Sequence, residues 1–410
     1  MQARNKPVIL FMAEAVTLAH FARVVALAKT LDPKIYSVII ASDPRYIELE
    51  APLDCIFHPI YSIPTSEFTQ ALAHGKPLYN TKTLIRYVEE DLTLLDTVKP
   101  DLVVGDFRLS LAVSAPLRKV PYASIVNAYW SPYALIDYPI PDLYITKLLG
   151  IKLAQKFFDF ARSIIFSLHA QPLNQVRHHF GLPSLGRDLR NTYTWGNYTL
   201  YADLPEWIPM LPMPPCHHFI GPVLWSTHTP LPEWWHSLPM DRPIIGVMLG
   251  SSGQSDLLSI VLATLSKLPV IVVAATGEKK MNSKLPVNTF VAEYLPIAKM
   301  VERVQILICN GGSLTTSQAL ANGVPVIGLC SNMDQLLNMQ AVERLGAGFA
   351  LRAGQLTENS LLSIIDLLLK NASYAVAAAI IGKKQKQVNF HECFQSVISG
   401  ILFSPSLSVD

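Results

Sequence analysis

A glycine-rich turn, Asn310 to Ser313, has the composition of an anion-binding site. It directly follows an apolar run over residues 304–309, which indicates a buried strand, and it precedes a helical segment over 315–321. At the carboxyl end of a parallel strand, the backbone N–H groups of such a turn and the dipole of the next helix attract negative charge. The stretch therefore predicts that a phosphate or another anion binds here.

Two titratable residues stand where elements begin or end. His20 lies in the first turn of a helix that starts near residue 17, where the helix dipole disfavours imidazolium and leaves the ring able to accept a proton. Asp106 ends the apolar stretch 101–106. A carboxylate partner would orient the ring and stabilise the imidazolium as it forms. On spacing alone, a histidine that caps its helix and a carboxylate that starts a turn explain the same residues.

The elements around these residues alternate between strands and helices. The chain opens with a strand at 8–12, a helix from residue 17 and a strand at 36–41, and the alternation resumes at residue 244. This order predicts an α/β fold with parallel sheets. Other segments are interpreted as a long irregular loop (51–80), helices (83–98 and 144–180) and strands (101–106, 121–126, 270–275 and 324–329).

Prolines concentrate in residues 205–243, which we interpret as a domain linker. We expect two Rossmann-like domains with parallel sheets facing a central cleft. The first, residues 1–225, would bind an acceptor, and the second, 226–385, a donor. Residues 386–410 are expected to form a C-terminal helix that packs back on the first domain.

The composition excludes several classes of protein. A net charge of +2 gives no electrostatic case for nucleic-acid binding. The five cysteines are scattered without a CxxC, so metal and disulfide frameworks are not expected and a reducing compartment fits better. The N-terminus lacks the pattern of a signal peptide, and the apolar window 257–276 is interrupted by Lys267 and Pro269. We therefore expect a cytoplasmic monomer or homodimer.

Several motifs resemble the family 1 nucleotide-sugar glycosyltransferases, which have the two-domain GT-B fold. The family signature is His-Gly-Gly-x-Gly-Thr-x-x-Glu-Ala-Leu, then Gly-Val-Pro and Asp-Gln. Residues 310–320 here are Asn-Gly-Gly-Ser-Leu-Thr-Thr-Ser-Gln-Ala-Leu, followed by Gly323-Val324-Pro325 and Asp334-Gln335. The chain is similar in order to the family at further places: Ala19-His20, residues 100–106, Ile220-Gly221-Pro222 and Gly250-Ser251-Ser252.

The resemblance implies a role for each matching residue. It makes His20 the catalytic base and Asp106 its partner. On the donor side it implies that Tyr294 stacks on the nucleobase and that Asp334 and Gln335 contact the sugar. The leaving diphosphate would be held by the turn and the helix that follows. The implied donor-binding residues are Ser251, Ser252, Tyr294, Asn310, Gly311, Gly312, Ser313, Thr315, Gln318, Asp334 and Gln335.

Three positions depart from the signature. Asn310 replaces the histidine that approaches a phosphate, Leu314 replaces a flexible glycine, and Gln318 replaces the glutamate that meets the ribose hydroxyls. These changes are compatible with a dTDP-sugar in place of a UDP-sugar, with low donor affinity, or with an inactive relative. We expect a nucleotide-sugar co-substrate and no further cofactor. Because no Asp-x-Asp occurs in the chain, we also expect metal-independent transfer with inversion.

The acceptor is inferred from aromatic residues in the first half. Loops and helices expected to line the cleft carry Tyr61, Phe68, Tyr129, Trp130, Tyr133 and Phe157. They suggest a hydrophobic small molecule, such as a natural product, although each alone is more often a core residue. The basic, apolar stretch 144–166 is compatible with a membrane surface and a lipid acceptor, a reading we do not favour. A silent helper protein and a sugar-nucleotide epimerase are the alternatives from other classes.

Overall fold

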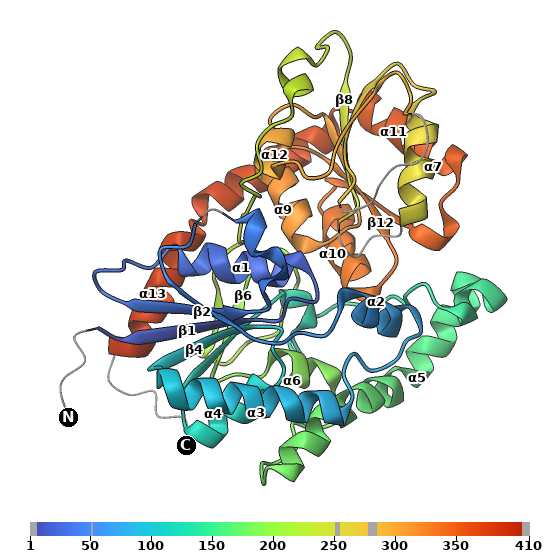
Figure 1. Cartoon of the computed structure of the whole chain (residues 1–410). Coiled ribbons are helices and arrows are strands. Elements are labelled where there is room, and N and C mark those ends of the chain that lie inside the picture. Colours follow the sequence, from blue (N-terminus) through green and yellow to red (C-terminus); the bar gives the residue numbers. More distant parts are fainter. Residues whose placement is uncertain (1–5, 51, 251–254, 278–284, 404–410) are drawn as a thin grey trace.

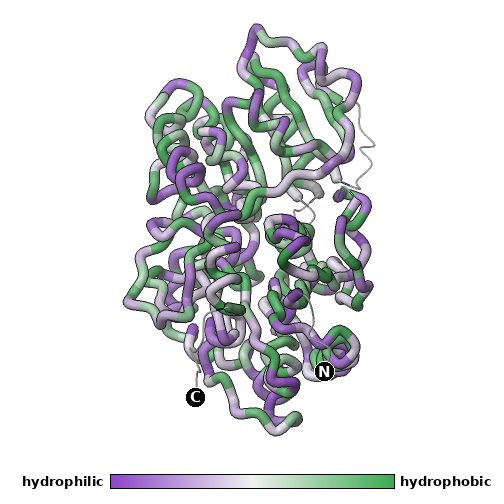
Figure 2. Tube along the Cα trace, turned by 90° about the vertical axis from the view of Figure 1, so that its left-hand side faces the viewer, coloured by the Kyte–Doolittle hydropathy of each residue, from purple (hydrophilic) through white to green (hydrophobic). Residues whose placement is uncertain are grey.

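The computed structural model describes residues 6–50, 52–250, 255–277 and 285–403. It consists of two α/β halves, each built on one parallel sheet (Figure 1). The tube coloured by hydropathy shows apolar segments running through the middle of both halves (Figure 2). The expected α/β class with two parallel sheets is therefore confirmed.

The N-terminal half is organised on a seven-stranded sheet in the order β3-β2-β1-β4-β5-β6-β7. Its central strands are buried on both faces, which fits their continuous apolar sequences. The strands are β1 (Val8–Ala13), β2 (Ser37–Ser42), β3 (Ile56–Pro59), β4 (Leu102–Asp106), β5 (Tyr122–Val126), β6 (Tyr198–Tyr201) and β7 (His217–Phe219). The helices are α1 (Leu18–Ala28), α2 (Thr65–Ala73), α3 (Thr81–Val98), α4 (Leu111–Arg118), α5 (Tyr144–His179) and α6 (Leu189–Thr194).

The C-terminal half repeats this plan on a six-stranded sheet in the order β10-β9-β8-β11-β12-β13. The strands are β8 (Ile244–Met248), β9 (Ile271–Ala275), β10 (Thr289–Ala292), β11 (Ile306–Cys309), β12 (Val326–Cys330) and β13 (Gly348–Arg352). The helices are α7 (Ser255–Leu265), α8 (Ile297–Met300), α9 (Ser313–Ala321), α10 (Met333–Arg344), α11 (Glu358–Lys370) and α12 (Ser373–Gln387). The turn and helix that the sequence analysis singled out thus connect β11 to β12.

The last helix, α13 (Phe390–Phe403), returns to the N-terminal half (Figure 1). Phe394 and Ile398 belong to the apolar cluster that also contains Phe11 and Phe21. The rings of Phe11 and Phe394 lie 6.0 Å apart, and Gln395 donates to the Thr30 carbonyl. The core of the first sheet is therefore completed by residues from the far end of the chain.

None of the described helices alone is long and apolar enough to cross a bilayer. One bent pair, Glu358–Lys370 with Ser373–Phe403, meets the criteria of length and composition when its members are taken together.

Two expectations about local structure were wrong or incomplete. Residues 51–80, expected to be irregular, contain β3 and the helix α2. The short strands β6, β7, β10 and β13 were not predicted, because three to five residues with mixed polarity carry little periodic signal. The proline-dense segment includes β7, which lies at the sheet edge, where proline's missing N–H is tolerated nearby.

The two halves touch through apolar and polar contacts. One buried apolar cluster contains Tyr129 and Trp207 of the N-terminal half together with Leu337 of the C-terminal half. The Asp142 carboxylate accepts from Arg352 at 3.0 Å and from the Gly354 N–H at 2.8 Å. Arg344 donates to the Trp207 carbonyl at 2.5 Å. Leu314, at the start of α9, packs against the apolar cluster of the N-terminal half. The signature position expected to be a flexible glycine is thus an apolar contact between the halves.

Candidate active site

His20 and Asp106 lie side by side because the strands that carry their neighbours are adjacent. Parallel β1 and β4 pair Ala13 with Asp106, so the loop from β1 to α1 returns His20 to the end of β4. His20 Nδ1 lies 2.7 Å from Asp106 Oδ1. If Nδ1–H donates to this carboxylate, Nε2 is left to accept a proton. The geometry is that of an oriented histidine base.

Arg23, one turn along α1, completes this group. Its Nε donates to Asp106 Oδ2 at 2.7 Å and its Nη2 to Oδ1 at 2.9 Å. Asp106 is fully buried, which by itself would raise the pKa of its carboxyl, but Arg23 and His20 outweigh burial and hold the pKa below its ordinary value. Asp106 is therefore an anion available to stabilise a protonated His20.

The residue after Asp106 fixes the plane of the histidine ring. Phe107 has a φ of 57°, a left-handed conformation that costs a residue other than glycine about 1–3 kcal/mol. Its ring stacks on His20 with centroids 4.8 Å apart and an angle of 7° between the planes. The strained turn thus places an aromatic face against the imidazole and restricts its rotation.

The glycine-rich turn, residues 310–313, depends on close packing behind it. Gly311 has a φ of +83°, and a Cβ at this position would lie 2.7 Å from Cys330 Sγ. The Asn338 amide, fully buried on α10, donates to the Gly311 carbonyl at 2.8 Å and to Thr316 Oγ1 at 2.9 Å. Asn338, which the sequence analysis did not select, therefore holds the turn in place from behind.

The N-terminus of α9 remains open to a ligand. Gly312 is the N-cap residue and supplies no side-chain cap, so the first N–H groups of the helix keep the capacity to bind an anion. Asn310 Oδ1 accepts from the Gly312 N–H at 3.1 Å. This bond stiffens the turn, whereas the sequence-based prediction gave Asn310 a contact with the donor. Thr315 lies half-buried in the first turn of α9.

Gln318 carries an unsatisfied acceptor. The residue is 7% exposed, and no described residue makes a hydrogen bond to its Oε1. A buried carbonyl oxygen without a donor is costly by about 1–3 kcal/mol. A bound hydroxyl or N–H group would remove this cost.

Asp334 and Gln335, which were predicted to contact the sugar, lie in the first turn of α10. Trp130 Nε1, from the N-terminal half, donates to Asp334 Oδ1 at 2.8 Å. Gln335 Oε1 accepts from the Ser331 N–H at 2.9 Å and from the Asn332 N–H at 3.4 Å, which caps the helix. The amide oxygen of Gln335 is thus engaged by the protein, and its predicted sugar contact would have to use the nitrogen.

A chain of hydrogen bonds joins the His20–Asp106 pair to the first residue of α9. Arg23 Nη1 donates to Asn127 Oδ1 at 2.7 Å. Ser313 is the first residue of α9, and its hydroxyl donates to the same oxygen at 3.3 Å. Asn127 is in turn held by Asp203 at 3.2 Å. Sequence analysis missed Arg23 and Asn127, because an arginine within a helical pattern and an asparagine after a strand have no distinctive spacing.

The predicted acceptor residues do not form one group. Phe68 is buried and contacts Phe107. Tyr129 is buried, and its pKa is raised by burial and by the nearby carboxylate of Asp334. Tyr61 lies under the Arg86 guanidinium, 3.8 Å from its ring centre.

Tyr133 and Phe157 lie away from the histidine. The Tyr133 ring packs edge-on against His217 of β7. The Phe157 side chain is 55% exposed on α5, so its expected place inside the cleft was wrong. The reason is helical phase, since its neighbour Phe158 is the buried residue of that turn.

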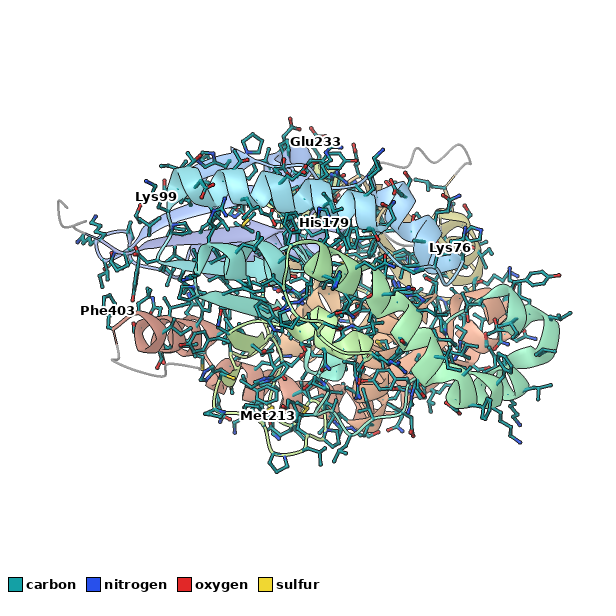
Figure 3. The ribbon with its side chains drawn as sticks, turned by 90° about the horizontal axis from the view of Figure 1, so that it is seen from below. Lys76, Lys99, His179, Met213, Glu233 and Phe403 are labelled. Atoms are coloured by element: carbon teal, nitrogen blue, oxygen red, sulfur yellow. The ribbon has the colours of Figure 1, made fainter. Side chains whose placement is uncertain are left out.

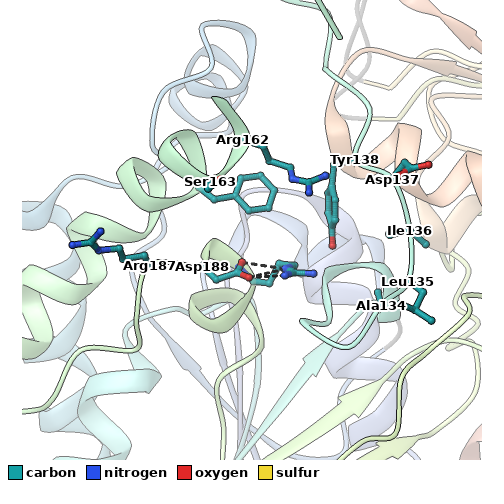
Figure 4. Close-up of a pocket in the computed structure, with 11 residues that line it drawn as sticks. Ala134, Leu135, Ile136, Asp137, Tyr138, Arg162, Ser163, Arg187 and Asp188 are labelled. Carbon is teal, nitrogen blue, oxygen red and sulfur yellow. Dashed lines mark hydrogen bonds and ion pairs between the residues drawn. The ribbon is translucent and has the colours of Figure 1, made fainter. Parts of the chain in front are cut away.

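A continuous set of aromatic rings extends from His20 to a pocket. Phe107 contacts Tyr193 at 5.3 Å, Tyr193 contacts Trp130 at 5.1 Å, and Trp130 contacts Tyr138 at 6.4 Å. Tyr138 lines a pocket of about 620 Å³, together with Phe166 of α5 and Leu135. Charged side chains also line this pocket: Asp137, Arg162, Arg187, Asp188 and Arg190. Arg162 reaches toward the Tyr138 ring at its rim (Figure 4). These rings are an apolar surface suited to a hydrophobic acceptor.

The remaining residues predicted to bind the donor are Ser251, Ser252 and Tyr294. Ser251 and Ser252 lie outside the described residues. Tyr294 is half-buried in the loop between β10 and α8, on the carboxyl edge of the sheet. Among the described residues no group of three or more His, Cys, Asp or Glu side chains is arranged to hold a metal ion.

Comparison with known proteins identifies the family. Residues 259–388 match the family model of the erythromycin biosynthesis protein CIII-like C-terminal domain. The chain is 49% identical over 371 residues to a PGL/p-HBAD biosynthesis rhamnosyltransferase of Mycobacterium bovis, covering 90% of this chain and 82% of that protein. An inactive PGL/p-HBAD biosynthesis glycosyltransferase of the same species is 48% identical over 259 residues, 63% of this chain and 71% of that protein.

The fold comparison agrees with this assignment. The spinosyn rhamnosyltransferase SpnG, solved in complex with thymidine diphosphate, superposes with a TM-score of 0.67 at 18% identity, covering 96% of this chain and all of that one (100%). The chain shares its fold with SpnG and about half of its aligned residues with the mycobacterial protein. The chain belongs to the family 1 glycosyltransferases of the GT-B fold and is a glycosyltransferase of the macrolide type.

Proposed function

We propose that this glycosyltransferase moves a sugar from a dTDP- or UDP-sugar to a hydroxyl of a hydrophobic small molecule, with inversion and without a metal ion. The observation that carries the proposal is the His20–Asp106 contact of 2.7 Å, which is joined through Arg23 and Asn127 to Ser313 at the open end of α9. A base and an anion-binding helix end that share one hydrogen-bond chain suit a reaction in which a hydroxyl attacks and a diphosphate leaves.

His20 would take the proton of the acceptor hydroxyl on Nε2 while Nδ1–H stays on Asp106. The hydroxyl oxygen forms a bond to the anomeric carbon, and the bond from that carbon to the diphosphate oxygen breaks. Because attack comes from the face opposite the leaving group, the anomeric centre inverts. The N–H groups at the start of α9 would stabilise the charge that develops on the diphosphate.

Two observations support a dTDP-sugar over a UDP-sugar. Gln318 has a neutral carbonyl where a glutamate would accept two ribose hydroxyls, and a deoxyribose offers one fewer. The mycobacterial relative is named a rhamnosyltransferase, and the SpnG structure holds thymidine diphosphate. We therefore propose a dTDP-deoxysugar such as dTDP-rhamnose as the first donor to test. The scattered cysteines support a cytoplasmic location.

The test is transfer to a panel of phenols and apolar alcohols with dTDP-rhamnose, dTDP-glucose and UDP-glucose, followed by nucleotide release and product mass. We expect His20→Ala to lower kcat by about 10²- to 10⁴-fold and to leave donor affinity unchanged. His236→Ala, which removes an exposed histidine, should keep full activity. Equal activity of His20→Ala and the unaltered protein would refute the proposed base.

A silent helper protein remains the second candidate, because one relative is named inactive and three signature positions differ. Calorimetry with a nucleotide-sugar distinguishes an active enzyme from a helper protein. Measurable affinity for dTDP together with product formation supports the enzyme, whereas a helper would bind no nucleotide-sugar and would raise the activity of a partner.

A further inference from the structure

The outer face of α5 is apolar although it is exposed. Side chains at helical spacing, each between 41% and 85% exposed, form a stripe along it. This α5 stripe consists of Tyr144, Leu148, Leu149, Leu153, Phe157, Phe160, Ile164 and Leu168. The N-terminal part of this helix projects from the body of the molecule (Figure 1), and side chains extend outward from it (Figure 3). Contiguous exposed apolar surface of this kind marks an interaction site.

The charges beside the stripe are almost all positive. Lys147, Lys152 and Lys156 are exposed, and Asp159 is the one acidic residue between 144 and 168. Lys76 lies next to this helix, because His169 bonds to the carbonyl of the preceding Gly75. A second copy of the chain would bring these cations against one another. An anionic surface complements them.

We propose that the α5 stripe docks on the surface of an anionic lipid bilayer and that the pocket behind it admits a lipid-borne acceptor. Apolar and aromatic residues flanked by lysines are the composition of helices that lie in the membrane interface. The inner side of the same helix contributes Phe166 to the pocket, and the aromatic rings described above lead from there to His20. The acceptor part of this inference rests on the proposed function.

The break in α5 suits this arrangement. Gly150 has a φ of 71°, so the segment 144–149 is turned relative to the rest of the helix. A Cβ at Gly150 would meet nothing within 4 Å, so packing does not impose the turn there. The bent helix exposes Leu148 on the segment before Gly150 and Phe160 on the segment after it.

The first test is co-sedimentation of the full chain with vesicles of phosphatidylcholine alone and of phosphatidylcholine with phosphatidylglycerol. We expect binding to the anionic vesicles, weakened by salt. Phe160→Glu with Ile164→Glu should reduce binding at least about tenfold. The matched control is Val376→Glu with Ile380→Glu, which changes an equally spaced exposed pair on α12 and should leave binding unchanged.

Charge is tested in the same way. Lys152→Glu with Lys156→Glu should lower binding to anionic vesicles by about tenfold or more, since each basic residue near such a surface contributes about 1 kcal/mol, roughly fivefold. Lys383→Glu with Lys386→Glu, on the exposed side of α12, is the control. Equal vesicle binding by the α5 and the α12 variants, or no binding by the unaltered chain, would overturn the proposal.

Activity separates this inference from the proposed function. With pentadecylphenol in anionic vesicles, Phe160→Glu with Ile164→Glu should lose most transfer, and with phenol in solution it should keep it. Loss of transfer with His20→Ala but no vesicle binding would overturn the docking alone. A dimer that Phe160→Glu with Ile164→Glu dissociates, without vesicle binding, would assign the stripe to a second copy instead.

Discussion

The two halves of the molecule handle charge by opposite means. Around His20, the N-terminal half buries carboxyl groups against arginines, with Asp106 on Arg23 and Glu14 on Arg108. The glycine-rich turn and the first half of α9, residues 310–318, contain no charged side chain. The turn is held in shape by Gly311 and by a hydrogen bond from the Asn338 amide. We therefore expect charge substitutions in the N-terminal half to change the rate of proton transfer, and changes of backbone geometry in the C-terminal half to change donor affinity.

The largest effect is expected from Asp106→Asn. An amide at this position can donate to Nδ1 and so favour the wrong tautomer of His20, which in an oriented histidine base lowers kcat by about 10³- to 10⁴-fold. Steady-state kinetics and dTDP calorimetry should show lost turnover with unchanged donor affinity. A parallel loss of donor affinity would contradict the assignment of proton transfer and donor binding to different halves.

Glu14 should make the unfolding free energy depend on pH. Burial raises the pKa of this carboxyl from 4.5 to about 7, against the opposing effect of Arg108. Because the folded state then binds more protons, stability is greatest below pH 4.5 and falls as the pH rises through 7. Glu14→Gln should remove up to about 3 kcal/mol of this decline, measured by urea unfolding from pH 4.5 to 8. Glu233→Gln, at an exposed site, should keep the slope of the unaltered protein.

Gly311→Ala tests backbone geometry in the donor half. The new Cβ would clash with Cys330 Sγ at 2.7 Å and would hold a left-handed φ, so stability should fall by about 1–3 kcal/mol and donor KM should rise. The pH profile of kcat should keep its shape. Gly181→Ala has a similar φ of +75° with nothing within 4 Å, so it isolates the conformational cost. An equal rise in donor KM for both variants would contradict the role of the turn.

Gln318→Glu should have the smallest effect. A carboxylate at this buried position would favour a ribose over a deoxyribose, so the ratio of kcat/KM for UDP-glucose to that for dTDP-glucose should rise about fivefold, the equivalent of one hydrogen bond of about 1 kcal/mol. The exposed Gln70→Glu should leave the ratio unaltered. An unchanged ratio in Gln318→Glu would place the ribose elsewhere.

The fold was largely predictable where the periodic signal was long. The predicted strand at 304–309 and helix at 315–321 correspond to β11 and α9 with shifts of two residues at their starts. The strands β6 and β7, four and three residues long, lacked such a signal. Short strands are defined by the neighbours that pair with them, and pairing is not local information.

The site was less predictable, for the same physical reason. His20 and Asp106 are 86 residues apart in sequence, and only the family resemblance paired them. The cause of their proximity is that β1 lies beside β4, a strand order that no local pattern records. Arg23 was missed and Asn338 was not selected as a site residue, because their roles arise from three-dimensional contacts with residues on other elements.

The return of α13 to the first sheet has a consequence for biosynthesis. As the chain leaves the ribosome, the N-terminal half is complete in sequence long before Phe394 and Ile398 emerge. Until then the apolar cluster around Phe11 and Phe21 lacks part of its cover. The first domain can therefore complete its core only after α13 has been synthesised, and part of its apolar cluster is exposed until then.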